Sequence, residues 1–295
     1  MKWLKGMALL LIANVLIFVT LSISFHVLVN FILPAFGIDV RGAVNQQDLV
    51  WAMVIGFGGA FLSLAFSKQM ARSMLECYQI TQPKSQAEHV IYSTVQDIAQ
   101  RVGIKMPEVW VYEGEDPNAF ATGPTKNNSM VAVSTGLLSN LNEQEVRAVL
   151  AHEMGHVYNG DMFTTTVLAG LMNTFVYFIS RWVYRNLAER NEMLAFGVYM
   201  FLQIVLSFLA MIPISWFSRR REFGADAFSA KAYGRDGMIS ALRAIDRWVN
   251  RAQVEYTTQD ALATMKISGK SNGFMHLFAT HPPIEERIAA LQRLS

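Results

Sequence analysis

Cysteine and charged residues are scarce in this sequence. A single cysteine, Cys77, among 295 residues excludes a disulfide within the chain and fits a reducing compartment. Only 16% of the residues are charged and 52% are hydrophobic, which is too apolar for an ordinary soluble domain. The net charge of +2 is too close to zero to indicate a nucleic-acid partner. The composition therefore predicts a protein of the lipid bilayer.

Four long stretches contain no Asp, Glu, Lys or Arg: residues 6–38, 49–67, 162–180 and 193–218. Each can supply the ~20 apolar residues that a helix needs to cross a bilayer. The first is longer than the apolar region of a signal peptide and lacks a small-x-small cleavage site, so we expect a retained anchor. Whether the last two stretches cross the membrane fully stays open.

Basic residues near these stretches indicate the orientation of the chain. Lys2 and Lys5 precede the first stretch, and Lys68, Arg72 and Lys84 follow the second. The positive-inside rule therefore places the N-terminus and the region after residue 67 in the cytoplasm. Three arginines lie between the last two stretches and three follow them, so charge does not decide the orientation of that pair in the membrane.

The first part of the cytoplasmic region reads as an α+β unit. Apolar spacing predicts a helix over 82–101, and alternation predicts strands in EVWVYEG and SMVAVST. The NAFATG stretch between them reads as a loop. Asn142, with Glu145 three residues later, predicts a capped helix that Gly160 ends. We expect a membrane hairpin over 1–67, a cytoplasmic α+β region over 68–161, a second hairpin over 162–218 and a cytoplasmic helical region over 219–295.

That capped helix carries the motif HEMGH. His152 and His156 project from one helical face one turn apart, so both imidazoles can bind a single Zn²⁺. Glu153 lies beside them, where it can accept a proton from zinc-bound water and pass it to a leaving amine. This arrangement predicts peptide hydrolysis.

A third protein ligand is required for zinc. The metzincin position, six residues after His156, holds Met162, which excludes that arrangement. The motif REFGAD supplies Glu222 as a candidate ligand, and Asp226 can accept the free ring N–H of His152. Because Glu222 must meet both histidines on one side of the bilayer, the chain between them crosses it an even number of times or not at all.

Four motifs, HEMGH, REFGAD, PNAFATG and THPPIEERI, together with the order of apolar stretches, resemble the bacterial HtpX-type membrane zinc endopeptidases. The resemblance covers essentially the whole chain, and distant relatives of that family are the CAAX-processing zinc endopeptidases. It implies a multi-pass protease of the bacterial inner membrane, facing the cytoplasm, that clears damaged or misassembled proteins as part of protein quality control and the stress response.

The resemblance also implies that Asn118 and Ala119 form an edge that aligns the substrate as an added strand, and exposed strand edges do bind extended peptides. His281 and Arg287 are candidates to stabilise the tetrahedral oxyanion. Packing and capping of the last helix is the alternative role for these two residues.

Together these patterns predict an α-helical membrane protein with a cytoplasmic zincin-like α+β catalytic domain. We expect a zinc metalloendopeptidase with one Zn²⁺ per chain, polypeptide substrates that are mainly membrane proteins, and no nucleic-acid partner. A CAAX-type processing endopeptidase and a non-catalytic scaffold or chaperone that uses zinc structurally are the alternatives. The oligomeric state and cleavage-site preference are not predicted.

Overall fold

A computed structural model describes residues 46–256 and 279–294, together with Phe31 and Pro34. The chain divides into two compact units. The apolar unit comprises Met1–Leu62 and Val167–Ala210, and the sheet unit comprises Ser63–Thr166 and Met211–Ser295. The expected membrane stretch 6–38 lies outside the described residues. The domain boundaries expected after residues 67, 161 and 218 stay a prediction.

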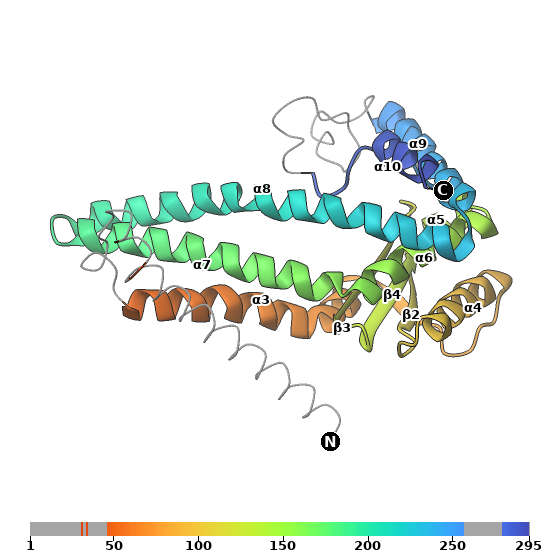
Figure 1. Ribbon diagram of the computed structural model, residues 1–295, viewed down its shortest axis with the longest axis horizontal. Helices are drawn as coiled ribbons and strands as arrows, with labels where there is room; N and C mark the ends of the chain where they lie inside the picture. Colours follow the sequence, from red (N-terminus) through yellow and green to blue (C-terminus); the bar gives the residue numbers. More distant parts are fainter. Residues whose placement is uncertain (1–30, 32–33, 35–45, 257–278, 295) are drawn as a thin grey trace, which may run out of the picture. The chain divides into compact units, whose positions relative to one another are not determined.

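Among the described residues, three helices are long and apolar enough to cross a membrane: α3 (Gln46–Met74), α7 (Asp161–Ala188) and α8 (Glu192–Tyr233) (Figure 1). They contain the stretches 49–67, 162–180 and 193–218 that the sequence predicted. Helix α8 runs for 42 residues with Pro213 inside it, so the last apolar stretch and the REFGAD motif belong to one continuous helix.

Within the apolar unit, α3 and α7 pack closely through small residues. A Cβ atom at Gly56 would lie 2.4 Å from Thr174 Oγ1, and one at Gly170 would lie 2.5 Å from the ring of Phe57. The carboxylate of Asp48 accepts a hydrogen bond of 2.6 Å from Arg185 Nη1. Small side chains at such positions let helix backbones approach closely, which is how helices associate in lipid.

The sheet unit contains four strands in the order β1-β2-β4-β3. They are β1 (Cys77–Gln79), β2 (Glu108–Tyr112), β3 (Ala119–Thr125) and β4 (Asn128–Ser134). Strands β2 and β4 are parallel, and the other two pairings are antiparallel. The loop expected at NAFATG was wrong, because Ala119 to Thr122 pair with β4. Among the described residues, β3 and β1 are the two edge strands of this sheet.

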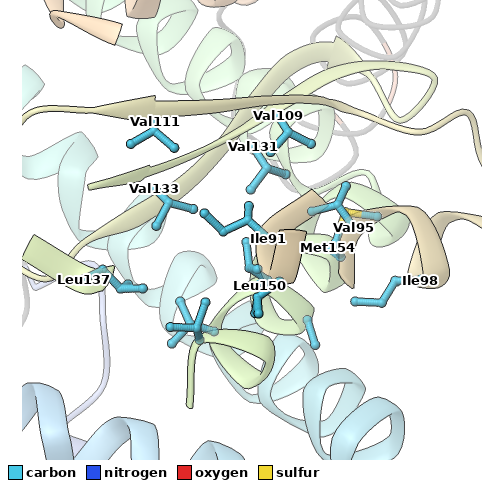
Figure 2. Close-up of a cluster of buried hydrophobic side chains, with 14 of the residues drawn as sticks. Ile91, Val95, Ile98, Val109, Val111, Val131, Val133, Leu137, Leu150 and Met154 are labelled. Carbon is cyan, nitrogen blue, oxygen red and sulfur yellow. The ribbon is translucent and has the colours of Figure 1, made fainter. Parts of the chain in front are cut away.

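Helices pack against this sheet and against one another. They are α4 (Gln86–Arg101), α5 (Thr135–Asn140), α6 (Glu143–Asn159), α9 (Arg235–Tyr256) and α10 (Ile284–Gln292). Helices α4, α5 and α6 contact the strands, α9 packs on α6, and α10 packs on α9. Figure 2 shows valines of β2 and β4 facing Ile91 of α4 and Leu150 of α6. Helix α4 begins three residues after Pro83, because the Ser85 hydroxyl accepts the Glu88 N–H. The core thus fixes α6 against the sheet.

The boundaries of α6 have local causes. Asn142 and Glu145 form the predicted capping box, in which each side chain accepts the other residue's backbone N–H, at 2.9 and 3.0 Å. Gly160 ends the helix in the left-handed conformation with φ of 70°, which glycine adopts without steric cost. Helix α7 begins at the next residue, Asp161.

The end of α3 is fixed to the sheet by charged residues. The Lys68 ammonium donates to Glu108 Oε1 at 2.7 Å and to Asn128 Oδ1 at 2.9 Å. Arg72 pairs with the same carboxylate and lies 4.8 Å from the centre of the Trp110 ring. These contacts attach the last turns of a membrane-length helix to β2 and to the β3–β4 turn.

Candidate metal centre

Helix α6 presents the two histidines of HEMGH on one face. Their Nε2 atoms lie 3.1 Å apart, and the two rings are nearly perpendicular. His152 is buried and His156 is partly buried, since the buried face of α6 continues into the core through Leu150 and Met154. The one-turn spacing therefore directs both ring nitrogens to the same point, as the sequence predicted.

Helix α8 brings Glu222 to that point. Its Oε1 lies 3.3 Å from His156 Nε2, and its Oε2 lies 3.5 Å from His152 Nε2. Bonds of ~2.0–2.1 Å in a tetrahedral zinc site separate the ligand atoms by about 3.3 Å. Each histidine Nε2 thus has a Glu222 oxygen at about the separation of two zinc ligands, and His152, His156 and Glu222 form the group of metal-binding side chains found among the described residues.

Close packing of the two helices produces this spacing. Gly155 faces α8, and a Cβ atom added there would lie 3.1 Å from both Ala225 Cα and Phe228 Cβ. The Ser229 hydroxyl donates to the Ala148 carbonyl at 2.6 Å, a second direct link between α8 and α6. The glycine inside HEMGH thus allows the helix that carries Glu222 to approach the histidines.

Each histidine directs its Nδ1 atom away from the donor triangle and toward a carboxylate. Asp226 Oδ1 lies 2.9 Å from His152 Nδ1, which is the contact expected from REFGAD. Asp161 Oδ2 lies 2.6 Å from His156 Nδ1. The sequence analysis did not identify Asp161, although this acidic residue follows HEMGH closely, five positions after His156.

The two arginines of the site bind these carboxylates. Arg287 Nε and Nη2 donate to both oxygens of Asp226, at 2.8 and 2.7 Å. The same guanidinium lies 3.3 Å from Glu222 and is buried. Arg221 pairs with Asp161. These contacts agree with a packing role, which is one part of the alternative considered from the sequence, whereas α10 has no side-chain cap hydrogen bond. A contact of Arg287 with an oxyanion stays a prediction.

His281 lies at the mouth of the site. Its Nδ1 is 2.8 Å from Glu222 Oε2, and about half of its side chain is exposed. Two residues before it, the Ala279 carbonyl accepts a hydrogen bond of 2.6 Å from Arg219 Nη1 on α8. An imidazole in this position can reach a substrate while it contacts the metal-binding carboxylate.

Glu153 follows the first histidine and is partly buried. Burial raises the pKa of its carboxyl, although His152 and His156 act in the opposite direction. For His152, burial disfavours the charged imidazole, but hydrogen bonds with Asp226 and Glu222 outweigh it and raise the pKa. His156 responds in the same way to Glu222 and Glu153, and its pKa is also raised. The site therefore retains protons that a metal ion would displace.

Asn118 and Ala119 lie where β3 begins. Ala119 pairs with Val133 of β4, and Asn118 is exposed. The Asn118 N–H donates to Ser134 Oγ at 2.9 Å, and its carbonyl accepts the Ser134 N–H at 2.9 Å. Strand β3 also contacts α6, the helix that carries HEMGH. Edge strand β3 thus lies beside α6, the helix that carries both histidines.

Comparisons of the sequence and of the fold with known proteins agree with one another. The sequence model of Peptidase family M48 matches residues 85–295. "Protease HtpX" of Pasteurella multocida is 44% identical over 286 residues, covering 95% of this chain and 98% of that protein. "Protease HtpX homolog" of Methylacidiphilum infernorum is 42% identical over 303 residues, covering 98% and 99%. The crystal structure of S. mikatae Ste24p shares the fold, with a TM-score of 0.61 and 20% identity over 96% of this chain and 67% of that chain.

Proposed function

The chain belongs to the HtpX proteases of peptidase family M48, and from this premise we propose that it hydrolyses internal peptide bonds of damaged or misfolded membrane proteins at the cytoplasmic face of the bacterial inner membrane. The predicted fold class and the predicted metallopeptidase activity are confirmed by this membership and by the site. One observation carries the proposal. The Nε2 atoms of the two histidines lie 3.1 Å apart, and each has one oxygen of Glu222 at 3.3 or 3.5 Å, which is close to the spacing of ligands in a zinc site.

His152, His156 and Glu222 would hold one zinc ion, and Asp226 would orient His152 by accepting its Nδ1–H. Zinc in such a site lowers the pKa of a bound water toward about 7 and polarises a carbonyl group. A catalytic site keeps one coordination position open, whereas a structural site is closed by four protein ligands. The donor group in the described part of the chain has three members, which favours catalysis over a scaffold role.

Glu153 would move the proton. Its raised pKa allows the carboxylate to take a proton from water as the water oxygen bonds to the scissile carbonyl carbon. The same carboxyl group would then donate that proton to the amide nitrogen as the C–N bond breaks. His281, exposed beside Glu222, is placed to donate a hydrogen bond to the oxygen of the tetrahedral centre.

Strand β3 would align the substrate. An extended peptide that adds to edge strand β3 gains backbone hydrogen bonds without a sequence requirement, which suits a protease of unfolded chains. Asn118 and Ala119 lie at the start of this strand, and Ser134 of β4 binds both the backbone N–H and the backbone carbonyl of Asn118. We assign these two residues to substrate alignment.

The cytoplasmic orientation is supported by charge. Lys68 and Arg72 follow the apolar part of α3, at the start of the region that leads to the sheet and to HEMGH. The arginines on either side of the last apolar stretch balance one another and do not decide its orientation. Basic residues are enriched on the cytoplasmic side of membrane helices.

The test compares purified wild type with Glu153→Gln on three substrates: an unfolded soluble protein, a detergent-solubilised membrane protein and a prenylated peptide. Zinc content is measured in both preparations. We expect one zinc in each, cleavage of the first two substrates by wild type alone, and loss of cleavage on chelation. Cleavage confined to the prenylated peptide would instead support CAAX-type processing, and zinc binding without any cleavage would support the scaffold alternative.

A further inference from the structure

Asp161 occupies a special place in the chain. It follows Gly160, whose left-handed conformation ends α6, and it is the first residue of the membrane-length helix α7. Its side chain is only 9% exposed. A carboxylate is costly to bury unless it is paired and hydrogen-bonded. The contacts of Asp161 therefore identify the groups that stabilise its buried carboxylate.

The two carboxylate oxygens of Asp161 contact two different helices. Oδ2 lies 2.6 Å from Nδ1 of His156 on α6, and Oδ1 pairs with the Arg221 guanidinium on α8. Arg221 immediately precedes Glu222 and lies 5.0 Å from the centre of the Phe217 ring. Asp161 thus connects a histidine of the metal centre to the helix segment that supplies its carboxylate.

We propose that Asp161 is a positioning residue of the metal centre and that Arg221 holds it in place. By accepting the Nδ1–H of His156, Asp161 leaves the Nε2 lone pair of His156 directed into the donor triangle. The inference rests on the proposed zinc-dependent function. It goes beyond that function by giving His156 its own Asp–Arg pair, equivalent to the Asp226–Arg287 pair at His152.

A purely structural role predicts a different behaviour. An acidic residue in the first turn of a helix is favourable because of the helix dipole, and Asp161 has that position in α7. Glu143 has the same position in α6 and pairs with Arg147 at 2.9 Å, but it is half exposed and is remote in sequence from both Asp161 and Glu222. Glu143→Gln is therefore the matched control for the loss of a first-turn charge and its ion pair.

The experiment measures zinc affinity by competition with a chelator for the full-length protein in detergent. The proteins compared are wild type, Asp161→Asn, Asp161→Ala and Glu143→Gln. The absorption spectrum of each cobalt-substituted protein reports the ligand geometry independently of proteolysis. We expect Asp161→Ala to bind zinc roughly 10–100-fold more weakly with an altered cobalt spectrum, and Glu143→Gln to match wild type in both. Asp161→Asn, which keeps an oxygen acceptor of the same size, should lie between them.

Each result decides the inference. Wild-type zinc affinity and an unchanged cobalt spectrum in folded Asp161→Asn and Asp161→Ala would overturn it, even if their thermal stability were lower. If Asp161→Ala failed to fold, the isosteric Asp161→Asn would decide on its own. Failure of the proposed function is distinguishable, since wild type itself would then bind no zinc or would bind zinc without cleaving either protein substrate.

Discussion

Replacing Gly155 with alanine tests whether close approach of α6 and α8 sets the geometry of the metal centre. The new Cβ would lie 3.1 Å from Ala225 Cα and 3.1 Å from Phe228 Cβ. Carbon atoms in favourable contact are about 3.5–4.0 Å apart, so α8 must withdraw by roughly 0.4–0.9 Å. Ala225 lies three residues after Glu222 on this helix, and we therefore expect Glu222 to move with it.

The expected effects on stability and activity differ. Overpacking costs about 1–3 kcal/mol, and exchanging Gly for Ala within a helix restores about 1 kcal/mol, so the free energy of unfolding should fall by only about 0–2 kcal/mol. A displacement of about 1 Å at a catalytic centre can cost ~100-fold in rate. We expect kcat/KM of Gly155→Ala to fall about tenfold and zinc affinity to fall with it.

Gly224→Ala is the matched control because it lies on α8 between Glu222 and Asp226. A Cβ atom there would have Asn159 Nδ2, at 3.9 Å, as its nearest contact outside its own neighbourhood. It should raise stability by up to about 1 kcal/mol and leave kcat/KM unchanged. The measurements are peptide cleavage kinetics, zinc content and thermal unfolding in detergent. Wild-type kinetics in Gly155→Ala, or an equal loss of activity in Gly224→Ala, would refute the reasoning.

Two further predictions follow from the charges of the sheet unit. Because the folded pKa of His152 is raised, protonation stabilises the metal-free protein fully below the ordinary pKa of 6.5, and this contribution is lost as pH rises through the raised value. The unfolding temperature of metal-free protein should therefore fall as pH rises from about 6.5. Zinc affinity, measured by competition, should rise over the same range because protons leave the ligands. A rise of both the unfolding temperature and the zinc affinity would contradict this prediction. Glu108→Ala removes the carboxylate shared by Lys68 and Arg72, so the free energy of unfolding should fall by about 1–3 kcal/mol, measured as a lower unfolding temperature. Glu143 is exposed, and Glu143→Ala should lower the free energy of unfolding by less than about 1 kcal/mol.

Local features of this protein were predictable from the sequence because their causes are local. The capping box at Asn142 and the left-handed Gly160 both depend on neighbours within four residues. The shared face of His152 and His156 follows from helical periodicity alone. The three apolar helices follow from composition over about 20 residues.

Features that depend on distant contacts were missed or left open. The residues of β3 include Gly123 and Pro124, which are typical of loops, but Thr122 and Thr125 on either side of them pair with β4, with a shift in register between the two pairs. Arg287 contacts Asp226 across 61 residues of sequence, so its role could not be read from the motif. Asp161 is close to His156 in sequence, yet their contact depends on how the chain turns at Gly160.

The distribution of the donor residues along the chain has a consequence for biosynthesis. His156 and Glu222 are separated by a whole apolar hairpin, α7 and the first part of α8. At synthesis rates of about 5–20 residues per second, the 66 residues from Val157 to Glu222 take roughly 3–13 s to emerge from the ribosome. Arg287 emerges later still. A nascent chain therefore exposes HEMGH without its third ligand, and hydrolytic competence waits until the hairpin has been made and delivered to the bilayer.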